Sequence, residues 1–149
     1  MNKIAAVVTE IEQTDIVTYI TLQCNDTQVR LIKTKTPLWA GVGEKVLFSF
    51  QEASVCISKE CPGKVSIENR IPGTLKKIRS KDSLCELTFE SDIGTVVSLI
   101  TENACRELGL EVGCRATMLL RGVDIHLEPD VVPMTLESFK KRSGTKVAN

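Results

Sequence analysis

The chain has 149 residues, of which 19 are basic and 19 acidic, so its formal net charge is zero. This balance and an aromatic fraction of only 4% argue against a nucleic-acid binder, which needs a basic surface or a platform for base stacking. Neither a membrane-length apolar segment nor a signal-like leader is evident, so we expect a cytoplasmic protein whose six cysteines are reduced.

The first half of the chain predicts a β-hairpin preceded by one strand. Residues 16–24 alternate between apolar and polar side chains with the two-residue period of a strand, and residues 27–33 continue that pattern. Asn25-Asp26 lies between these segments and is typical of a tight turn. Residues 4–11, which are rich in Ile, Val and Ala, predict the preceding strand.

One helical turn and two further strands complete this half. Thr36 followed by Pro37 favours the start of a helix, because Thr can accept a bond from a free N–H and Pro lacks one. The pattern then predicts strands at 45–50 and 53–58. The lone Trp39 is expected to fill the core of this half.

The second half of the chain repeats the first. Asn2 corresponds to Asn69 and Ile4 to Ile71, at an offset of 67 residues that continues without a gap through the third strand. Such a repeat indicates two copies of one structural unit. The strands expected in the second copy are 71–79, 84–91, 94–100, 115–121 and 123–128.

A helix is predicted at 101–108, between the third and fourth strands of the second copy. Thr101 can cap its first turn, Glu102 suits the positive end of the helix dipole, and Gly109 ends it. Beyond this helix the offset becomes 70 residues, so that Gln51 corresponds to Arg121.

These elements predict an all-β fold of two tandem OB-like five-stranded barrels, each with a short helix between strands three and four. The expected divisions are 1–60 for the first barrel, 66–129 for the second, and 130–149 for a tail that is partly helical or disordered. Units of about sixty residues have small cores, so we expect them to pack together or to form a dimer or trimer.

Reactive side chains in the sequence favour structural roles. Lys33-Thr34-Lys35-Thr36 offers cations and hydroxyls to an anion, although a solvated loop is the favoured interpretation. The cysteines lack the paired spacing of a zinc site, and nothing in the pattern gives His126 a nucleophile to activate. We therefore expect no catalytic residues, no metal site and no cofactor, and a protein that is not an enzyme.

The second copy resembles the Mop (TOBE) family of molybdate- and tungstate-binding domains, also called molbindin-like domains. The resemblance is carried by the segment Ser66-Ile67-Glu68-Asn69-Arg70-Ile71-Pro72-Gly73-Thr74, by Leu108-Gly109-Leu110-Glu111-Val112-Gly113, and by Arg121-Gly122-Val123 between the last two strands. Two tandem copies are similar to the paired ligand-binding domains of molybdate-dependent transcriptional regulators, here without their helix-turn-helix domain.

The resemblance implies that a tetrahedral oxyanion is held by hydrogen-bond donors where barrels meet. Carried over by position, it implies Ser66 and Asn69 in the opening motif, and Arg121 with Gly122 in place of the family's Lys and small residue. The family's Arg is replaced by Glu68, whose charge is expected to repel an anion. Weaker candidates for the site are Lys3, Gln51 and Lys33.

Two functions follow from this resemblance. The first is binding of molybdate or tungstate for intracellular storage, homeostasis or sensing, by a homo-oligomer. The second is a regulatory or protein-interaction module that binds little or no anion and acts through a DNA-binding or transporter partner. Direct contact with nucleic acid or with a membrane is not expected under either hypothesis.

Overall fold

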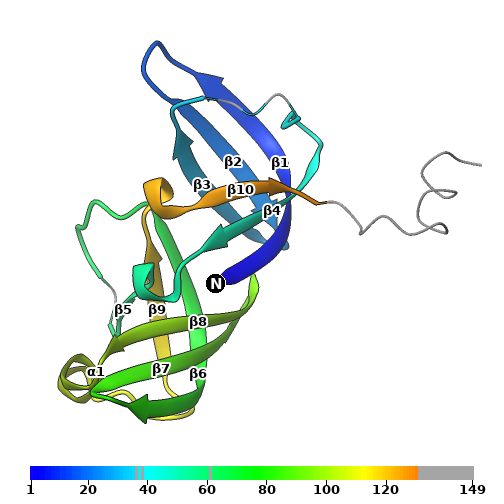
Figure 1. Cartoon of the computed structure of the whole chain (residues 1–149). Helices are drawn as coiled ribbons and strands as arrows, with labels where there is room; N and C mark the ends of the chain where they lie inside the picture. Colours follow the sequence, from blue (N-terminus) through cyan, green and yellow to red (C-terminus); the bar gives the residue numbers. More distant parts are fainter. Residues whose placement is uncertain (36, 38, 61, 131–149) are drawn as a thin grey trace, which may run out of the picture.

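The described part of the chain consists of two five-stranded antiparallel sheets and one short α-helix (Figure 1). The computed structural model describes residues 1–35, 37, 39–60 and 62–130, so the expected tail helix and the expected cap at Thr36 lie outside the described residues. The first sheet has the order β10-β4-β1-β2-β3, and the second has the order β5-β9-β6-β7-β8.

Most strand bounds lie within two residues of the predicted ones, because alternation and turn chemistry are local signals. The two closing strands are the exception: the sequence predicts that they begin at residues 53 and 123, where the structure has 3-10 turns, and they begin three residues later. In the first sheet the strands are β1 (Asn2–Gln13), β2 (Thr18–Cys24), β3 (Thr27–Lys33), β4 (Lys45–Phe50) and β10 (His126–Pro129). In the second sheet they are β5 (Cys56–Ser58), β6 (Asn69–Lys81), β7 (Leu84–Ser91), β8 (Gly94–Thr101) and β9 (Arg115–Leu120).

The two halves exchange their last strands, and the expectation that each half completes its own sheet is wrong. Strand β5 pairs with β9 of the second half, with Cys56 opposite Leu119, and β10 pairs with β4 of the first half, with His126 opposite Ser49. The short 3-10 turns η1 (Glu52–Ser54) and η2 (Gly122–Asp124) carry the chain across, as Figure 1 shows. Each sheet therefore depends on both halves, while the division at 1–60 and 66–129 stays a prediction.

The same irregularity bends the first strand of each half. The register of β1 against β2 shifts at Thr9, and that of β6 against β7 shifts at Lys76, its counterpart at an offset of 67 residues. A bulge bends a strand and increases its twist. Leu75, just before the second bulge, exchanges backbone hydrogen bonds with Gly113 and Cys114. These bonds hold the loop that precedes β9 against the curved strand β6.

The hairpin turns of the two halves also meet. The Asn25 side chain donates to the backbone oxygen of Asp92, its repeat counterpart, over 2.8 Å. The Asp92 carboxylate in turn accepts from the Asp26 backbone N–H at 2.9 Å and from the Thr27 hydroxyl at 2.6 Å. The two halves thus touch at counterpart turns of the repeat.

A continuous apolar core joins the two halves. It is largely aliphatic, as the low aromatic content requires, and alternate residues of β2 such as Ile20 and Leu22 are buried in it. Phe48 and Phe50 stack with ring centroids 6.1 Å apart. Trp39 is 39% exposed, so the expectation that it fills the first core is wrong.

The helix α1 (Glu102–Leu108) follows β8 as predicted. The Thr101 hydroxyl accepts from the Ala104 N–H at 3.0 Å, and Gly109 ends the helix in the left-handed conformation with φ 62°. Lys59 from the connection between the halves donates to the Gly109 carbonyl at 2.7 Å.

The first half lacks a counterpart of α1 among the described residues. It has a hydrogen-bonded turn from the Pro37 carbonyl to the Ala40 N–H instead. The expectation of a helix in each copy is therefore not met in the first copy, within the part of the chain that the structure describes. Within that part, neither α1 nor the 3-10 turns have the length and apolar character needed to span a membrane.

Candidate functional site

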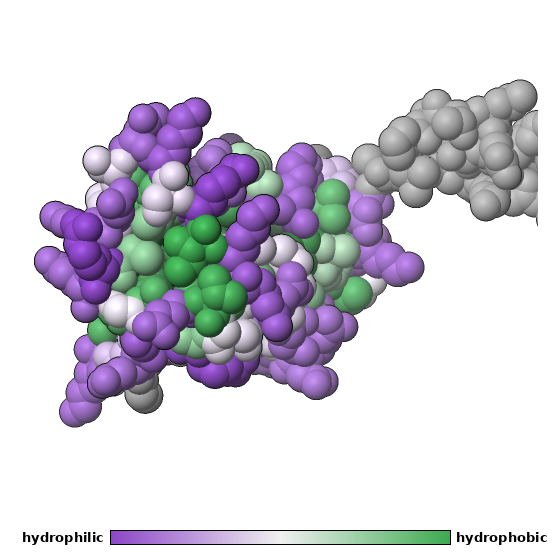
Figure 2. Space-filling model, turned by 90° about the horizontal axis from the view of Figure 1, so that it is seen from below, coloured by the Kyte–Doolittle hydropathy of each residue, from purple (hydrophilic) through white to green (hydrophobic). Residues whose placement is uncertain are grey.

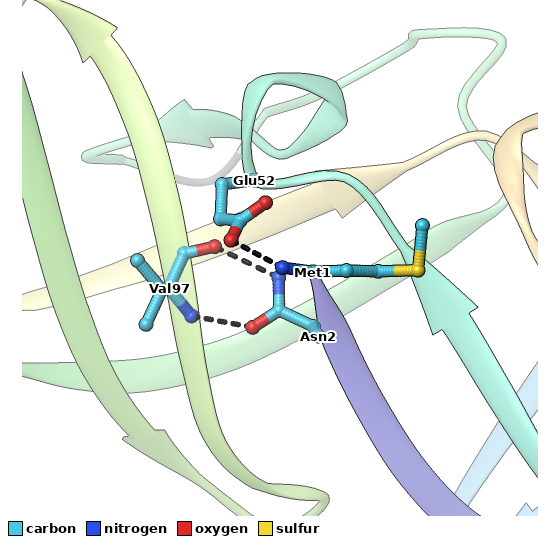
Figure 3. Close-up of polar contacts among 4 residues, drawn as sticks. All are labelled: Met1, Asn2, Glu52 and Val97. Carbon is cyan, nitrogen blue, oxygen red and sulfur yellow. Dashed lines mark hydrogen bonds and ion pairs between the residues drawn. The ribbon is translucent and has the colours of Figure 1, made fainter.

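Two equivalent asparagines fasten the halves to each other. The Asn69 amide is 3% exposed; it donates to the Arg30 carbonyl and accepts from the Arg30 N–H, both at 2.8 Å. The Asn2 amide makes the same pair of bonds with Val97 of β8, both at 2.9 Å (Figure 3). Because its carbonyl and amino groups are both bound to backbone, Asn69 positions the start of β6.

The turn η2 packs against β3 of the other half. A Cβ on Gly122 would lie 2.8 Å from the Arg30 carbonyl oxygen and 3.2 Å from the Leu31 Cα. Both are backbone atoms, which cannot move aside without distorting β3. Gly122 is buried there, and its N–H donates to the Glu68 carboxylate. We call Arg30, Glu68, Asn69, Arg121 and Gly122 the η2 junction.

The turn η1 makes the corresponding junction with β8. We call this second set of residues the η1 junction; it consists of Met1, Asn2, Gln51, Glu52 and Val97. The Met1 ammonium donates to the Glu52 carboxylate at 2.6 Å, as Figure 3 shows. This hydrogen bond is the main reason that the pKa of Glu52 lies below its ordinary value.

The predicted cation of the site, Arg121, lies at the η2 junction and is exposed. Its Nε donates to the Asp124 carboxylate within the same turn, at 3.0 Å. The guanidinium side chain is 62% exposed, so it can rotate toward an anion at the cost of a weak surface ion pair. Gln51, its counterpart, is exposed in the η1 junction and makes no side-chain bond to cap that turn.

The loop before β6 is shaped by an arginine that sequence reasoning missed. Arg70 donates to the carbonyl oxygens of Gly63, Val65 and Ile67 over 2.9, 2.8 and 3.2 Å. The loop curls around this guanidinium and leaves Ser66 exposed on its surface. An Arg directly after the motif Asn is the only sequence signal that could have indicated this role.

The two remaining candidates do not belong to the η2 junction. Lys3 of β1 pairs with Glu128 of β10 at 3.2 Å, so its charge is used between the first strand and the exchanged strand. Lys33 ends β3 and is half-buried, and desolvation lowers the pKa of its ammonium group. The structure thus brings together Asn69, Arg121 and Gly122 of the predicted set, with Gln51 at the equivalent junction.

The cysteines do not form a metal centre among the described residues. No group of three or more His, Cys, Asp or Glu side chains in that part of the chain could hold an ion. Cys24, Cys85 and Cys105 are buried, and burial is the main cause that raises the pKa of the Cys24 and Cys105 thiols. Raised thiol pKa values favour the unreactive protonated form.

The geometry defines a class of protein: a mostly β chain with two repeat-related sheets, joined through equivalent junctions between a turn and a strand. Residues 65–127 match the family model described as the TOBE domain. The chain therefore contains a TOBE domain, which coincides with the second repeat. No curated protein matches the sequence.

A solved structure extends this likeness to both repeats. It is described as the cytoplasmic molybdate-binding protein ModG, in a crystal form with molybdate bound. The match has a TM-score of 0.81 and covers 86% of this chain and 95% of that one. The sequences are 20% identical, so the match establishes the shared fold.

Proposed function

We propose that this protein binds a tetrahedral oxyanion, molybdate or tungstate, at the junctions where its two OB-like halves meet. The observation that carries the proposal is that the Gly122 N–H already holds an anionic oxygen, supplied by Glu68, and that the residue before Gly122 in the chain is the exposed cation Arg121. A backbone N–H and a guanidinium are suitable donors for such an anion. The molybdate-bound state of the structurally similar ModG supports the choice of ligand.

In this proposal four of the predicted residues have defined roles. Gly122 and Arg121 donate to the anion, and Ser66 contributes its exposed hydroxyl from the adjacent loop. Asn69 holds the strand and turn in place through its two bonds to Arg30. The protein would serve in the storage, homeostasis or sensing of the anion inside the cell.

A homo-oligomer, a dimer or trimer, is part of the proposal. Figure 2 shows apolar surface in the middle of the face seen from below, with hydrophilic side chains around it, and further apolar surface toward the right of that view. Exposed apolar areas with a polar rim are typical of protein–protein contacts. Sedimentation velocity with and without molybdate would measure the assembly, and a monomer in both conditions would contradict this part.

Calorimetric titration with molybdate, tungstate and sulfate tests the binding proposal. Arg121→Gln is expected to weaken molybdate binding about tenfold, because it removes one charge-assisted hydrogen bond. Arg79→Gln is the matched control, since Arg79 is equally exposed, at 65%, and also pairs with one carboxylate at 3.0 Å. Absence of heat with all three anions, both for wild type and for Glu68→Ala, would reject the proposal.

One observation favours the second candidate function, a regulatory module that acts through a protein partner. The Glu68 carboxylate satisfies the Gly122 N–H without any ligand. Under this alternative the melting temperature would be unchanged by molybdate up to millimolar concentrations, while a defined DNA-binding or transporter subunit would co-purify with the chain. A melting temperature that rises with molybdate would exclude it.

A further inference from the structure

Each junction contains one carboxylate that belongs to the chain itself. At the η2 junction, Glu68 accepts from Gly122; at the η1 junction, Glu52 accepts from Met1. Residues 1 and 68 are repeat counterparts at the offset of 67, and residues 52 and 122 are counterparts at the offset of 70. The same two positions are therefore bridged by a carboxylate and a donor in both halves, with the roles reversed.

The position of Glu68 is constrained by its neighbour in the chain. Asn69 is buried and bound at both ends of its amide to Arg30, so the backbone at residue 68 cannot drift away from η2. The partner atom is equally fixed, because Gly122 is buried against β3. When the Glu68 carboxylate binds the Gly122 N–H, the only conformational freedom that it loses is therefore that of its own side-chain torsions.

Two anions cannot share this donor. A backbone N–H has one hydrogen, and a second negative group near the first is repelled by its charge. A tethered acceptor on a short arm also competes at an effective concentration in the millimolar range. A free oxyanion must therefore displace Glu68 before it can bind the Gly122 N–H.

We propose that Glu68 is a tethered competitor that occupies the anion position of the η2 junction and sets the affinity and selectivity of that junction for oxyanions. This inference rests on the proposed function, since it concerns the same donor. The competitor favours a ligand of high charge that gains more from Arg121 and Gly122 than a carboxylate does. Removal of the carboxylate would convert a weak site into a tight one.

The test is calorimetric titration of the full chain with molybdate, comparing wild type with Glu68→Gln and Glu68→Ala. Glu68→Gln keeps the size of the side chain and removes its charge. The matched control is Glu107→Gln, which removes an exposed carboxylate from α1. Both Glu68 variants are expected to bind molybdate at least about tenfold more tightly than wild type, and the control is expected to bind as wild type does.

The outcomes separate the two proposals. Equal affinities for wild type and both Glu68 variants would overturn the role of Glu68 and leave oxyanion binding intact. Absence of binding by every variant would overturn oxyanion binding, and the competitor role with it.

A second measurement follows the contact directly. The amide proton of Gly122 in a ¹H–¹⁵N spectrum is expected to move upfield in ligand-free Glu68→Ala, because a hydrogen bond to a carboxylate is lost, and to return downfield when molybdate is added. An unchanged Gly122 signal in ligand-free Glu68→Ala would overturn the inference whether or not the variant binds anion.

Discussion

Replacing Asn69 by Ala removes the two hydrogen bonds that fasten the start of β6 to Arg30 of β3. The Arg30 N–H and carbonyl then lose their partner at a site where Asn69 itself is 3% exposed. An unsatisfied buried polar group costs about 1–3 kcal/mol, and water can reach part of this site, so we expect a total loss of about 2–4 kcal/mol in the free energy of unfolding.

Equilibrium unfolding in urea measures this loss. With a denaturant slope of about 2 kcal/mol per molar, the midpoint is expected to fall by about 1–2 M. Asn103→Ala is the control, because Asn103 is exposed and its side-chain oxygen accepts from Arg106 within the same helix; its effect should stay within about 0.5 kcal/mol. A loss below about 0.5 kcal/mol for Asn69→Ala would refute the claim that this amide joins the halves.

Two further predictions concern the junctions. Gly122→Ala is expected to destabilise the protein by about 1–3 kcal/mol, because its Cβ would lie 2.8 Å from the Arg30 carbonyl oxygen. Gly41→Ala should be neutral in the same urea assay, because the nearest atom to its Cβ outside the adjacent residues would be the Glu44 Cγ, at 3.9 Å. Glu52→Gln should lower stability by about 0.5 kcal/mol at pH 7. The Met1 ammonium depresses the pKa of Glu52, so the higher melting temperature of wild type relative to Glu52→Gln should disappear as the pH falls below 4.5, the ordinary pKa of a Glu side chain. A difference in melting temperature that persists in acid would contradict the bond between Met1 and Glu52.

The elements of the fold could be predicted because their signals are local. Strand β3 spans Thr27–Lys33 and α1 ends at Gly109, as alternation and capping chemistry indicated. The exchange of β5 and β10 could not be predicted, since the two halves repeat one pattern and each closing strand fits either sheet. Pairing with the partner half is decided by how η1 and η2 direct the chain, which is a property of the assembled fold.

The family resemblance selected the positions Ser66, Asn69, Arg121 and Gly122 but not their contacts, and anion binding by these residues stays a prediction. The structure places Asn69 and Gly122 against the same residue, Arg30. The resemblance also presented Glu68 as a residue that repels the ligand, whereas the structure shows its carboxylate as the acceptor for Gly122. Arg70 was missed because its partners are backbone carbonyls, which a sequence pattern does not display.

The most direct test of oxyanion binding at the junctions is a crystal structure of Glu68→Ala grown with tungstate, in which the anomalous signal of tungsten locates the ion. We predict a tungsten peak at the η2 junction, with a tungstate oxygen within hydrogen-bond distance of the Gly122 nitrogen. Tungsten peaks found only away from both junctions, or none at all in crystals grown at millimolar tungstate, would contradict the account.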